Sequence, residues 1–255
     1  MGLNNNKFNT CNKIKIVHKI NKETVFFKDL LVDTNYMISG SFLISLLLDR
    51  KDYSDIDLYF TKHKFYNLAV KKLNNSSNFE LLYKTKYAYT YKCSFNNTIL
   101  QLVKATKKNA YVLANSHDFA NCCMAYDSVT NKLHITSQAI KAWKTNTLLI
   151  NKTPCLSKRY PITYFYNQFY LLASRVFKYL KRYSLVLHTT TWLALKEVLK
   201  IYDTNSFTLN HTNNVVAISS YAINIYITPF EYKKLYLDLK DFIANENNMH
   251  ELRTM

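Results

Sequence analysis

The chain has 255 residues, of which 48% are hydrophobic, so it can form one large domain or two small ones with a sizeable core. This composition excludes a disordered protein, and no apolar run reaches the ~20 residues that a membrane-spanning helix needs. The five cysteines form no C-x-x-C pair and, with seven scattered histidines, give neither a zinc spacing nor a disulfide framework. We therefore expect an intracellular protein that does not act at a membrane.

The net charge is +17, and the positive charge is clustered along the chain. From Ser128 to Lys196 there are eleven Lys and Arg and no acidic residue, and from Leu58 to His117 only Glu80 is acidic. Such clustering favours a nucleic-acid partner. An A+T-rich coding sequence would also enrich Lys, but it would not by itself remove the acidic residues.

The hydrophobic pattern of the first half predicts short strands that alternate with helices, after a polar and basic segment over residues 1–22 that we expect to be partly ordered. The elements expected in chain order are a short helix over 24–31, a strand over 36–39, a buried helix over 41–50, a strand over 55–60, a helix from a cap at Thr61 to about Leu73, a hairpin over 87–95 and 98–105, and two further elements over 119–126 and 133–143.

After Pro154 the pattern becomes mainly helical. Pro161 opens a long helix with an apolar stripe and a basic opposite side, and a second helix is expected over 190–201. A capping box over 228–231 leads a last helix to about Ala244. The predicted fold class is α+β, with a small mixed β-sheet domain over 1–153 and a mostly helical, basic domain over 154–255.

One segment combines a glycine with paired carboxylates. The chain contains only two glycines, and Gly40 is followed by Ser41, an apolar stretch, and then Asp55-Ile56-Asp57. Two carboxylates one residue apart on a strand point to the same side, where they can hold a divalent cation. The Ser41 hydroxyl and the backbone N–H groups after Gly40 are suited to phosphate.

This pattern resembles the nucleotidyltransferase superfamily, which includes DNA polymerase β, poly(A) polymerases and tRNA nucleotidyltransferases. In that superfamily Gly-Gly or Gly-Ser precedes Asp-x-Asp by roughly ten to fifteen residues. The resemblance implies that Asp55 and Asp57 are catalytic and hold Mg²⁺ or Mn²⁺, and that Gly40 and Ser41 bind the β- and γ-phosphates of a nucleoside triphosphate. Looser segments over 99–103, 118–122 and 175–179 resemble members encoded by large DNA viruses and bacteriophages, which would place the protein in the host cytoplasm.

The sequence also departs from the family pattern. Many members have a third carboxylate on the strand expected here over 98–103, where its position is taken by Gln101. Either the Asp-x-Asp pair suffices, as in some branches, or Asp118 approaches the site; the competing interpretation makes Asp118 the N-cap of a helix over 119–126. The Arg-Asp pair of the poly(A) polymerase branch is replaced by Ile44 and Ser45.

Basic residues of the second half complete the expected site. On the long helix, Arg175 and Lys178 are candidates for binding the nucleotide. Four more are candidates for binding nucleic acid: Lys158, Arg159, Lys181 and Arg182. The competing interpretation is a solvated basic face.

The function expected from these observations is untemplated addition of nucleotides to a nucleic-acid 3′ hydroxyl, with RNA favoured over DNA. The helical region is expected to close a basic cleft over the site. A catalytically silent fold that binds nucleic acid or belongs to a virion, and nucleotide transfer to a protein, are the alternatives. The sequence leaves the oligomeric state open.

Overall fold

The computed structural model describes residues 10–151, 162–205, 216–219, 224–227, 229–244 and 249–250, and it describes side chains over 13–151, 171–200 and 234–244. The chain forms two compact units. The first, here called the sheet unit, runs to His117 and also contains Asn121–Lys141. The second, the helical unit, consists of Asp118–Ala120 and the chain from Ala142 onward. The domain boundary expected after residue 153 stays a prediction.

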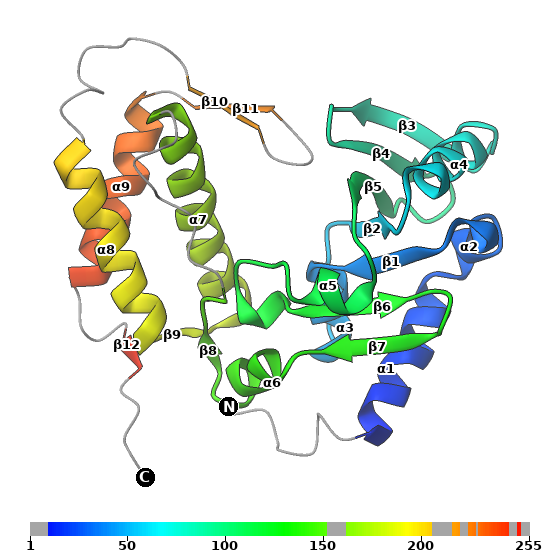
Figure 1. Ribbon diagram of the computed structural model, residues 1–255, viewed down its shortest axis with the longest axis horizontal. Coiled ribbons are helices and arrows are strands. Elements are labelled where there is room, and N and C mark those ends of the chain that lie inside the picture. The colour runs from blue at the N-terminus through cyan, green and yellow to red at the C-terminus, as the bar shows by residue number, and fades with distance from the viewer. Residues whose placement is uncertain are drawn as a thin grey trace. The chain divides into compact units, whose positions relative to one another are not determined.

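The sheet unit is built on one seven-stranded mixed sheet with the strand order β3-β4-β5-β2-β1-β6-β7 (Figure 1). Its elements are α1 (Thr10–Glu23), α2 (Val25–Lys28), η2 (Val32–Thr34), β1 (Tyr36–Ser39), α3 (Ser41–Leu47), β2 (Ile56–Phe60), α4 (His63–Asn74), β3 (Phe79–Lys84), β4 (Ala88–Cys93), β5 (Ile99–Thr106), α5 (Ala110–Ala114), β6 (Met124–Asp127) and β7 (Lys132–Ile135). The 3-10 turn η3 (Ala120–Cys122) and α6 (Ser137–Lys144) lie where the chain passes between the units. Strands β2 and β5 are parallel, and the other neighbouring strands are antiparallel.

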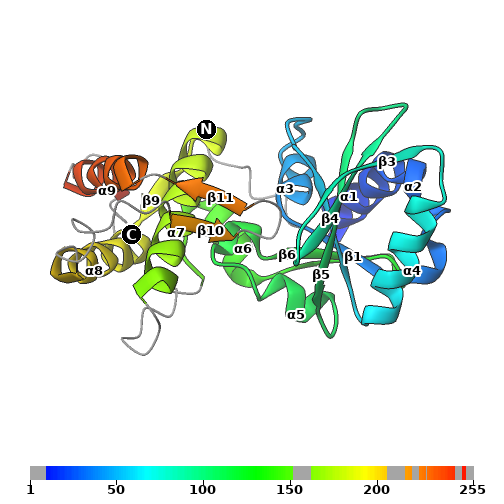
Figure 2. The same cartoon turned by 90° about the horizontal axis from the view of Figure 1, so that it is seen from above.

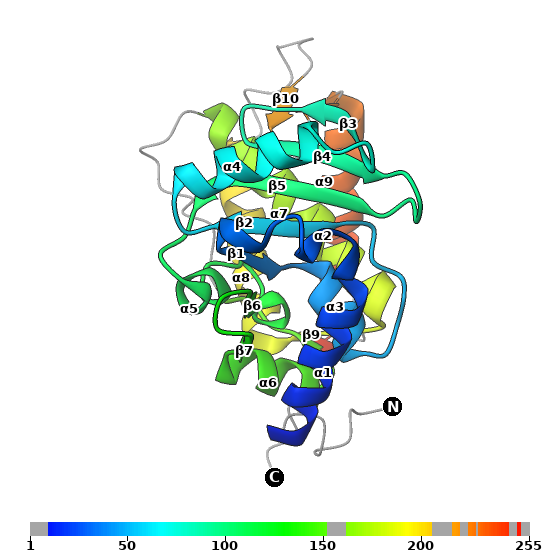
Figure 3. The ribbon, with the colours of Figure 1, turned by 90° about the vertical axis from the view of Figure 1, so that its right-hand side faces the viewer.

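Helices cover both faces of this sheet. Helices α1, α2 and α4 lie on one face, as Figure 3 shows, where the ring of Phe27 contacts Tyr36 and the ring of Tyr66 contacts Phe60. On the other face α5 packs Leu113 into a cluster with Met37 of β1, against which Tyr59 of β2 lies. The alternation of β2 follows from this arrangement, because Ile56, Leu58 and Phe60 are buried and the residues between them are half-buried.

Among its described residues, the helical unit contains three long helices that lie beside one another (Figure 2). They are α7 (Ile162–Tyr183), α8 (Thr189–Asn205) and α9 (Pro229–Ala244). The rings of Phe177 and Phe242 join α7 to α9, with their centroids 5.7 Å apart, and the Trp192 indole N–H of α8 donates to the Ile243 carbonyl of α9 at 3.1 Å. Short strands complete the unit: β8 (Thr147–Leu148), β9 (Val186–His188) and β12 (Met249–His250) form one sheet, and β10 (Val216–Ser219) and β11 (Asn224–Ile227) form a hairpin.

The predicted fold class is confirmed: a mixed sheet with helices is followed by a mostly helical region. The strand over 36–39 and the hairpin over 87–105 are confirmed, as are the long helix after Pro161 and the helix over 190–201. The capping box over 228–231 lies outside the described side chains, although α9 begins there at Pro229.

Three expectations are wrong in detail. The expected helix over 119–126 is a 3-10 turn followed by strand β6, so Asp118 is not the N-cap of such a helix. The helix after β2 begins at His63 and has Lys62 instead of Thr61 at its N-cap, and the expected helix over 41–50 ends at Leu47, because Asp49 adopts a left-handed φ of 57°. In the N-terminal segment, for which no particular element was expected, the described residues Thr10–Glu23 form the fourteen-residue helix α1.

A buried phenol in the sheet unit predicts sensitivity to alkali. Tyr66 is 4% exposed, and its hydroxyl has no hydrogen-bond partner among the described residues. Burial, followed by the nearby phenol of Tyr89, raises the pKa of Tyr66 to about 12. The unfolded phenol ionises near pH 10, so stability is fully present below pH 10 and falls as the pH rises toward 12.

Tyr66→Phe is therefore expected to unfold at an unchanged or higher temperature at pH 7 and to lose less stability between pH 10 and 12. Each pKa unit corresponds to about 1.4 kcal/mol, so between pH 10 and 12 the unaltered protein should lose about 2 kcal/mol more of its unfolding free energy than Tyr66→Phe does. Thermal unfolding across this pH range measures it, with Tyr83→Phe at an exposed position as the matched control. Equal alkaline losses in both variants would contradict the assignment to Tyr66.

Candidate active site

The glycine of the predicted motif lies against one of its carboxylates. Gly40 adopts φ 91° and ψ −156°, a conformation that is essentially restricted to glycine, and it directly precedes α3. A Cβ atom at this position would lie 2.7 Å from Asp57 Oδ2, which is closer than such atoms approach in proteins. The Asp57 carboxylate can therefore lie against the backbone of residue 40 only if residue 40 has no side chain.

The strand register brings four polar residues into one line across the sheet. Ser39 of β1 pairs with Asp57 of β2, Asp57 pairs with Gln101 of β5, and Gln101 pairs with Thr90 of β4. Residues paired in this way project from the same face. We call Ser39, Asp57, Gln101 and Thr90 the polar row, and it places Gln101 beside Asp57, where the expected third carboxylate would stand.

Asp55 lies directly before β2, on a loop that is tied to α3. The Ser54 hydroxyl donates to Asp55 at 2.7 Å, and the Asp55 side chain is half-buried. Three residues earlier, Asp52 accepts a hydrogen bond of 2.9 Å from the Ser45 hydroxyl and pairs with Arg50 at 2.7 Å. Because Ser45 is fully buried, its hydrogen bond to Asp52 anchors the loop that carries Asp55.

A histidine that the sequence did not indicate touches the first residue of the polar row. The Ser39 hydroxyl donates to the Met124 carbonyl at 2.5 Å, and His117 Nε2 lies 2.6 Å from the same hydroxyl oxygen. Because a hydroxyl has one proton, His117 must donate from Nε2 to Ser39. The contact joins residues 78 apart, and no local pattern in the sequence could have identified it.

The carboxylates fit a hard divalent cation. Among the described residues, no three His, Cys, Asp or Glu side chains are grouped so that they could hold a metal ion by themselves. Mg²⁺ takes one or two protein carboxylates and leaves its other positions to phosphate oxygens and water. Asp55 and Asp57, which lie two residues apart at the start of β2, are compatible with that pattern.

Four of the six basic candidates lie on α7 of the helical unit, far along the chain from this motif. Arg175 forms an ion pair with Asp118, and Arg182 holds its guanidinium 5.6 Å from the centre of the Tyr183 ring. Lys178 and Lys181 are exposed. Asp118 therefore has a partner within the helical unit, and a nucleotide contact of Arg175 stays a prediction. Lys158 and Arg159 lie outside the described residues.

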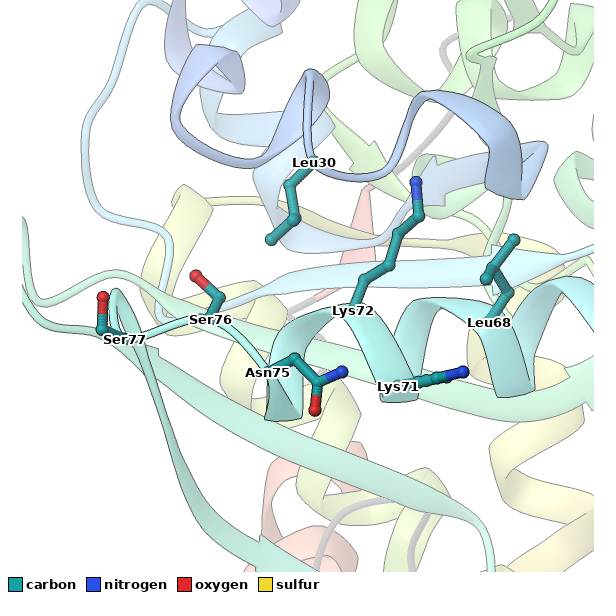
Figure 4. A pocket seen from close by; sticks show the side chains of 7 residues that line it. All are labelled: Leu30, Leu68, Lys71, Lys72, Asn75, Ser76 and Ser77. Carbon is teal, nitrogen blue, oxygen red and sulfur yellow. The ribbon is translucent and has the colours of Figure 1, made fainter.

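The pocket shown in Figure 4 lies apart from the motif. It has a volume of about 490 Å³ and lies at the C-terminal end of α4, where Lys72 extends toward the segment that carries Leu30 and pairs with Asp33 at 3.1 Å. Its lining consists of Leu30, Leu68, Lys71, Lys72, Asn75, Ser76 and Ser77. None of these residues belongs to the candidate active site.

None of the described helices combines the length and the apolar character needed to cross a membrane.

Solved structures of nucleotidyltransferases share this fold. The Thermotoga maritima CCA-adding enzyme, solved in complex with tRNA, matches with a TM-score of 0.54 and 15% identity over 89% of this chain and 54% of its own. A CCA-adding enzyme in complex with ATP matches with a TM-score of 0.55 and 14% identity, again over 89% and 54%. The chain thus spans about half the length of these enzymes.

The sequence itself points to a different relationship. No curated protein matches the chain. Residues 3–146 match the profile described as "Gabija anti-defense 2 family protein". Because this match covers more than half of the 255 residues, the chain belongs to the Gabija anti-defense 2 family.

Proposed function

We propose that this protein is a metal-dependent nucleotidyltransferase that adds nucleotides from a nucleoside triphosphate to a nucleic-acid 3′ hydroxyl, with RNA as the favoured acceptor. The observation that carries the proposal is the packing of Gly40 against Asp57 at the start of β2, with Asp55 two residues earlier. The shared fold with CCA-adding enzymes supports it. The family name, which denotes action against a defense system, is compatible with a phage-encoded protein acting in the host cytoplasm.

In this proposal each residue of the motif has its own task. Asp55 and Asp57 hold Mg²⁺ or Mn²⁺, while the Ser41 hydroxyl and the backbone next to Gly40 bind the β- and γ-phosphates. The bound metal ion would neutralise charge on the triphosphate and on the leaving pyrophosphate. Arg175 and Lys178 contact the nucleotide, and the nucleic acid meets Lys158, Arg159, Lys181 and Arg182.

The test is incorporation of each labelled nucleoside triphosphate into a short RNA primer with Mg²⁺ or Mn²⁺. The double variant Asp55→Asn/Asp57→Asn is expected to lose more than about 100-fold of the rate, because metal-assisted charge stabilisation contributes several kcal/mol. Asp33→Asn/Asp49→Asn is the matched control, since it removes the same charge from two exposed carboxylates that pair with lysines. Equal transfer by both double variants would contradict the proposal.

Gln101 favours a second candidate function, a catalytically silent fold that binds nucleic acid. It is 5% exposed and stands beside Asp57 in the polar row, where a carboxylate would strengthen metal binding. This candidate predicts that no nucleotide is transferred to RNA or DNA, and that Asp55→Asn/Asp57→Asn binds RNA as tightly as the unaltered protein.

A further inference from the structure

Three loops of the sheet unit meet at one end of its sheet. Strands β2 and β5 run parallel and end together, with Phe60 paired to Thr106. Strand β3 ends and β4 begins at the same place, because Lys84 pairs with Tyr89 and Ala88 pairs with Val103 near the end of β5. The loops β2–α4, β3–β4 and β5–α5 therefore lie together, and their elements can be followed in Figure 3.

These three loops and the ends of the strands and helix that flank them carry seven lysines, which we call the basic end: Lys62, Lys64, Lys84, Lys86, Lys104, Lys107 and Lys108. Backbone hydrogen bonds hold the loops in contact, since Lys104 N–H donates to the Tyr87 carbonyl at 2.7 Å and Lys107 N–H donates to the Phe60 carbonyl at 3.0 Å. All seven are exposed except Lys107, which is half-buried, and none pairs with a described carboxylate.

The segment from Leu58 to His117, which contains all seven lysines, has no acidic residue near the basic end. Glu80 is the only acidic residue between Leu58 and His117, and it lies at the opposite end of β3, paired across the strands with Lys92. Seven like charges around three loops repel one another, and the repulsion is relieved when a polyanion replaces the surrounding counterions.

Aromatic rings lie among the lysines. Lys86 Nζ lies 4.8 Å from the centre of the Tyr87 ring, and Lys84 Nζ lies 5.9 Å from that of Tyr89. Tyr111, three residues after Lys108 at the start of α5, is 65% exposed. An exposed ring close in the chain to these lysines can stack on a base while the lysines contact the adjoining phosphates.

We infer that the basic end is a binding surface for single-stranded nucleic acid. Phosphates contact the lysines of the three loops, and Tyr111 stacks on an unpaired base. An acidic protein surface could form ion pairs with the lysines, but it would offer no base on which the exposed Tyr111 ring could stack. A duplex hides its base faces, so stacking favours a single strand.

This surface is separate from the motif at the start of β2. Phe60 and Lys104 each lie three residues beyond the polar row along their strands, which corresponds to roughly 10 Å. The inference goes beyond the proposed transfer reaction and does not depend on it, because binding is measured without nucleotide or metal. A failure here would leave the test of the reaction unaffected.

The experiment measures binding of a labelled single-stranded RNA of mixed sequence over a range of salt concentrations. Lys84→Ala/Lys86→Ala/Lys104→Ala is expected to weaken binding about tenfold or more at low salt. It should also reduce the slope of log affinity against log salt by about 2, since each lost phosphate contact in a single strand contributes about 0.7. Lys15→Ala/Lys22→Ala/Lys132→Ala is the matched control, with the same charge change at exposed positions on α1 and β7.

A separate variant tests the stacking contact. Tyr111→Ala is expected to weaken binding about fivefold or more with the salt slope unchanged, because stacking contributes about 1–3 kcal/mol per base without releasing counterions. The inference is overturned if both lysine triples weaken binding equally, or if the first triple leaves the slope unchanged. It is also overturned if an RNA duplex binds as tightly as the single strand, or if polyglutamate competes as well as unlabelled RNA.

Discussion

Gly40→Ala is expected to destabilise the sheet unit by about 2–4 kcal/mol. The backbone at φ 91° and ψ −156° costs a residue with a side chain about 1–3 kcal/mol. The new methyl group would also lie 2.7 Å from Asp57 Oδ2, so either the carboxylate or the start of α3 must move. At about 2–4 °C per kcal/mol, the thermal midpoint should fall by about 5–15 °C. Nucleotide transfer should be lost in parallel if Asp57 holds the metal ion.

A double-mutant cycle separates the two causes. In Gly40→Ala/Asp57→Ala the carboxylate is absent, so the contact term should vanish while the backbone term remains, and the combined loss should be smaller than the sum of the single losses. Ser41→Ala is the control for an alanine at the neighbouring position without the unusual backbone. If the two losses are additive, or if Gly40→Ala leaves the thermal midpoint unchanged, the result would contradict the close contact between Gly40 and Asp57.

Gln101→Glu is expected to make the stability of the protein depend on divalent cations. Gln101 is 5% exposed, its amide donates to Thr90 at 3.5 Å, and it stands beside Asp57. A second carboxylate there would be buried next to a like charge, which costs several kcal/mol at neutral pH. We therefore expect a fall of about 5–15 °C in the thermal midpoint without metal, and a recovery of most of that loss when Mg²⁺ or Mn²⁺ is added.

The pH dependence of this variant follows from the same charge. Burial and Asp57 should raise the pKa of the new carboxyl group, so the loss should be largest above neutral pH and should disappear as the pH falls toward 4. The control is Gln101→Glu in an Asp57→Asn background, which should not respond to metal. Thermal unfolding with and without Mn²⁺ measures both. An equal metal response in the two backgrounds would show that Asp57 is not a metal ligand.

The sequence predicted those parts of the fold that are set by local chemistry. The strand at Tyr36–Ser39 and the hairpin around Asn96 and Asn97 follow from apolar alternation and from a turn residue that tolerates positive φ, which Asn97 adopts at 58°. The segment over 119–126 was assigned wrongly, because a short apolar run is equally compatible with a buried strand and a buried helix. Only the pairing of β6 with β1 decides between them.

In the candidate site, too, the local motif could be predicted from the sequence, whereas the tertiary contacts around it could not. The family resemblance assigned Gly40 and Asp57 to one site, and the antiparallel pairing of β1 with β2 brings them together. The contacts that hold this arrangement could not be predicted. The hydrogen bonds between Ser45 and Asp52 and between His117 and Ser39 depend on side-chain packing, and hydroxyl residues of this kind are too common in the sequence to indicate a partner.

Asparagine occupies four left-handed turns in the described part of the chain, whereas residue 40 requires glycine. Asn35, Asn97, Asn131 and Asn146 adopt φ values between 43° and 58°, as glycine often does in other proteins. Asparagine tolerates that region, so coding sequences poor in glycine codons can still encode these turns. It does not tolerate the backbone of residue 40, and its Cβ would collide with Asp57 as that of alanine does. Mutational drift toward asparagine can therefore proceed at the turns but is blocked at position 40.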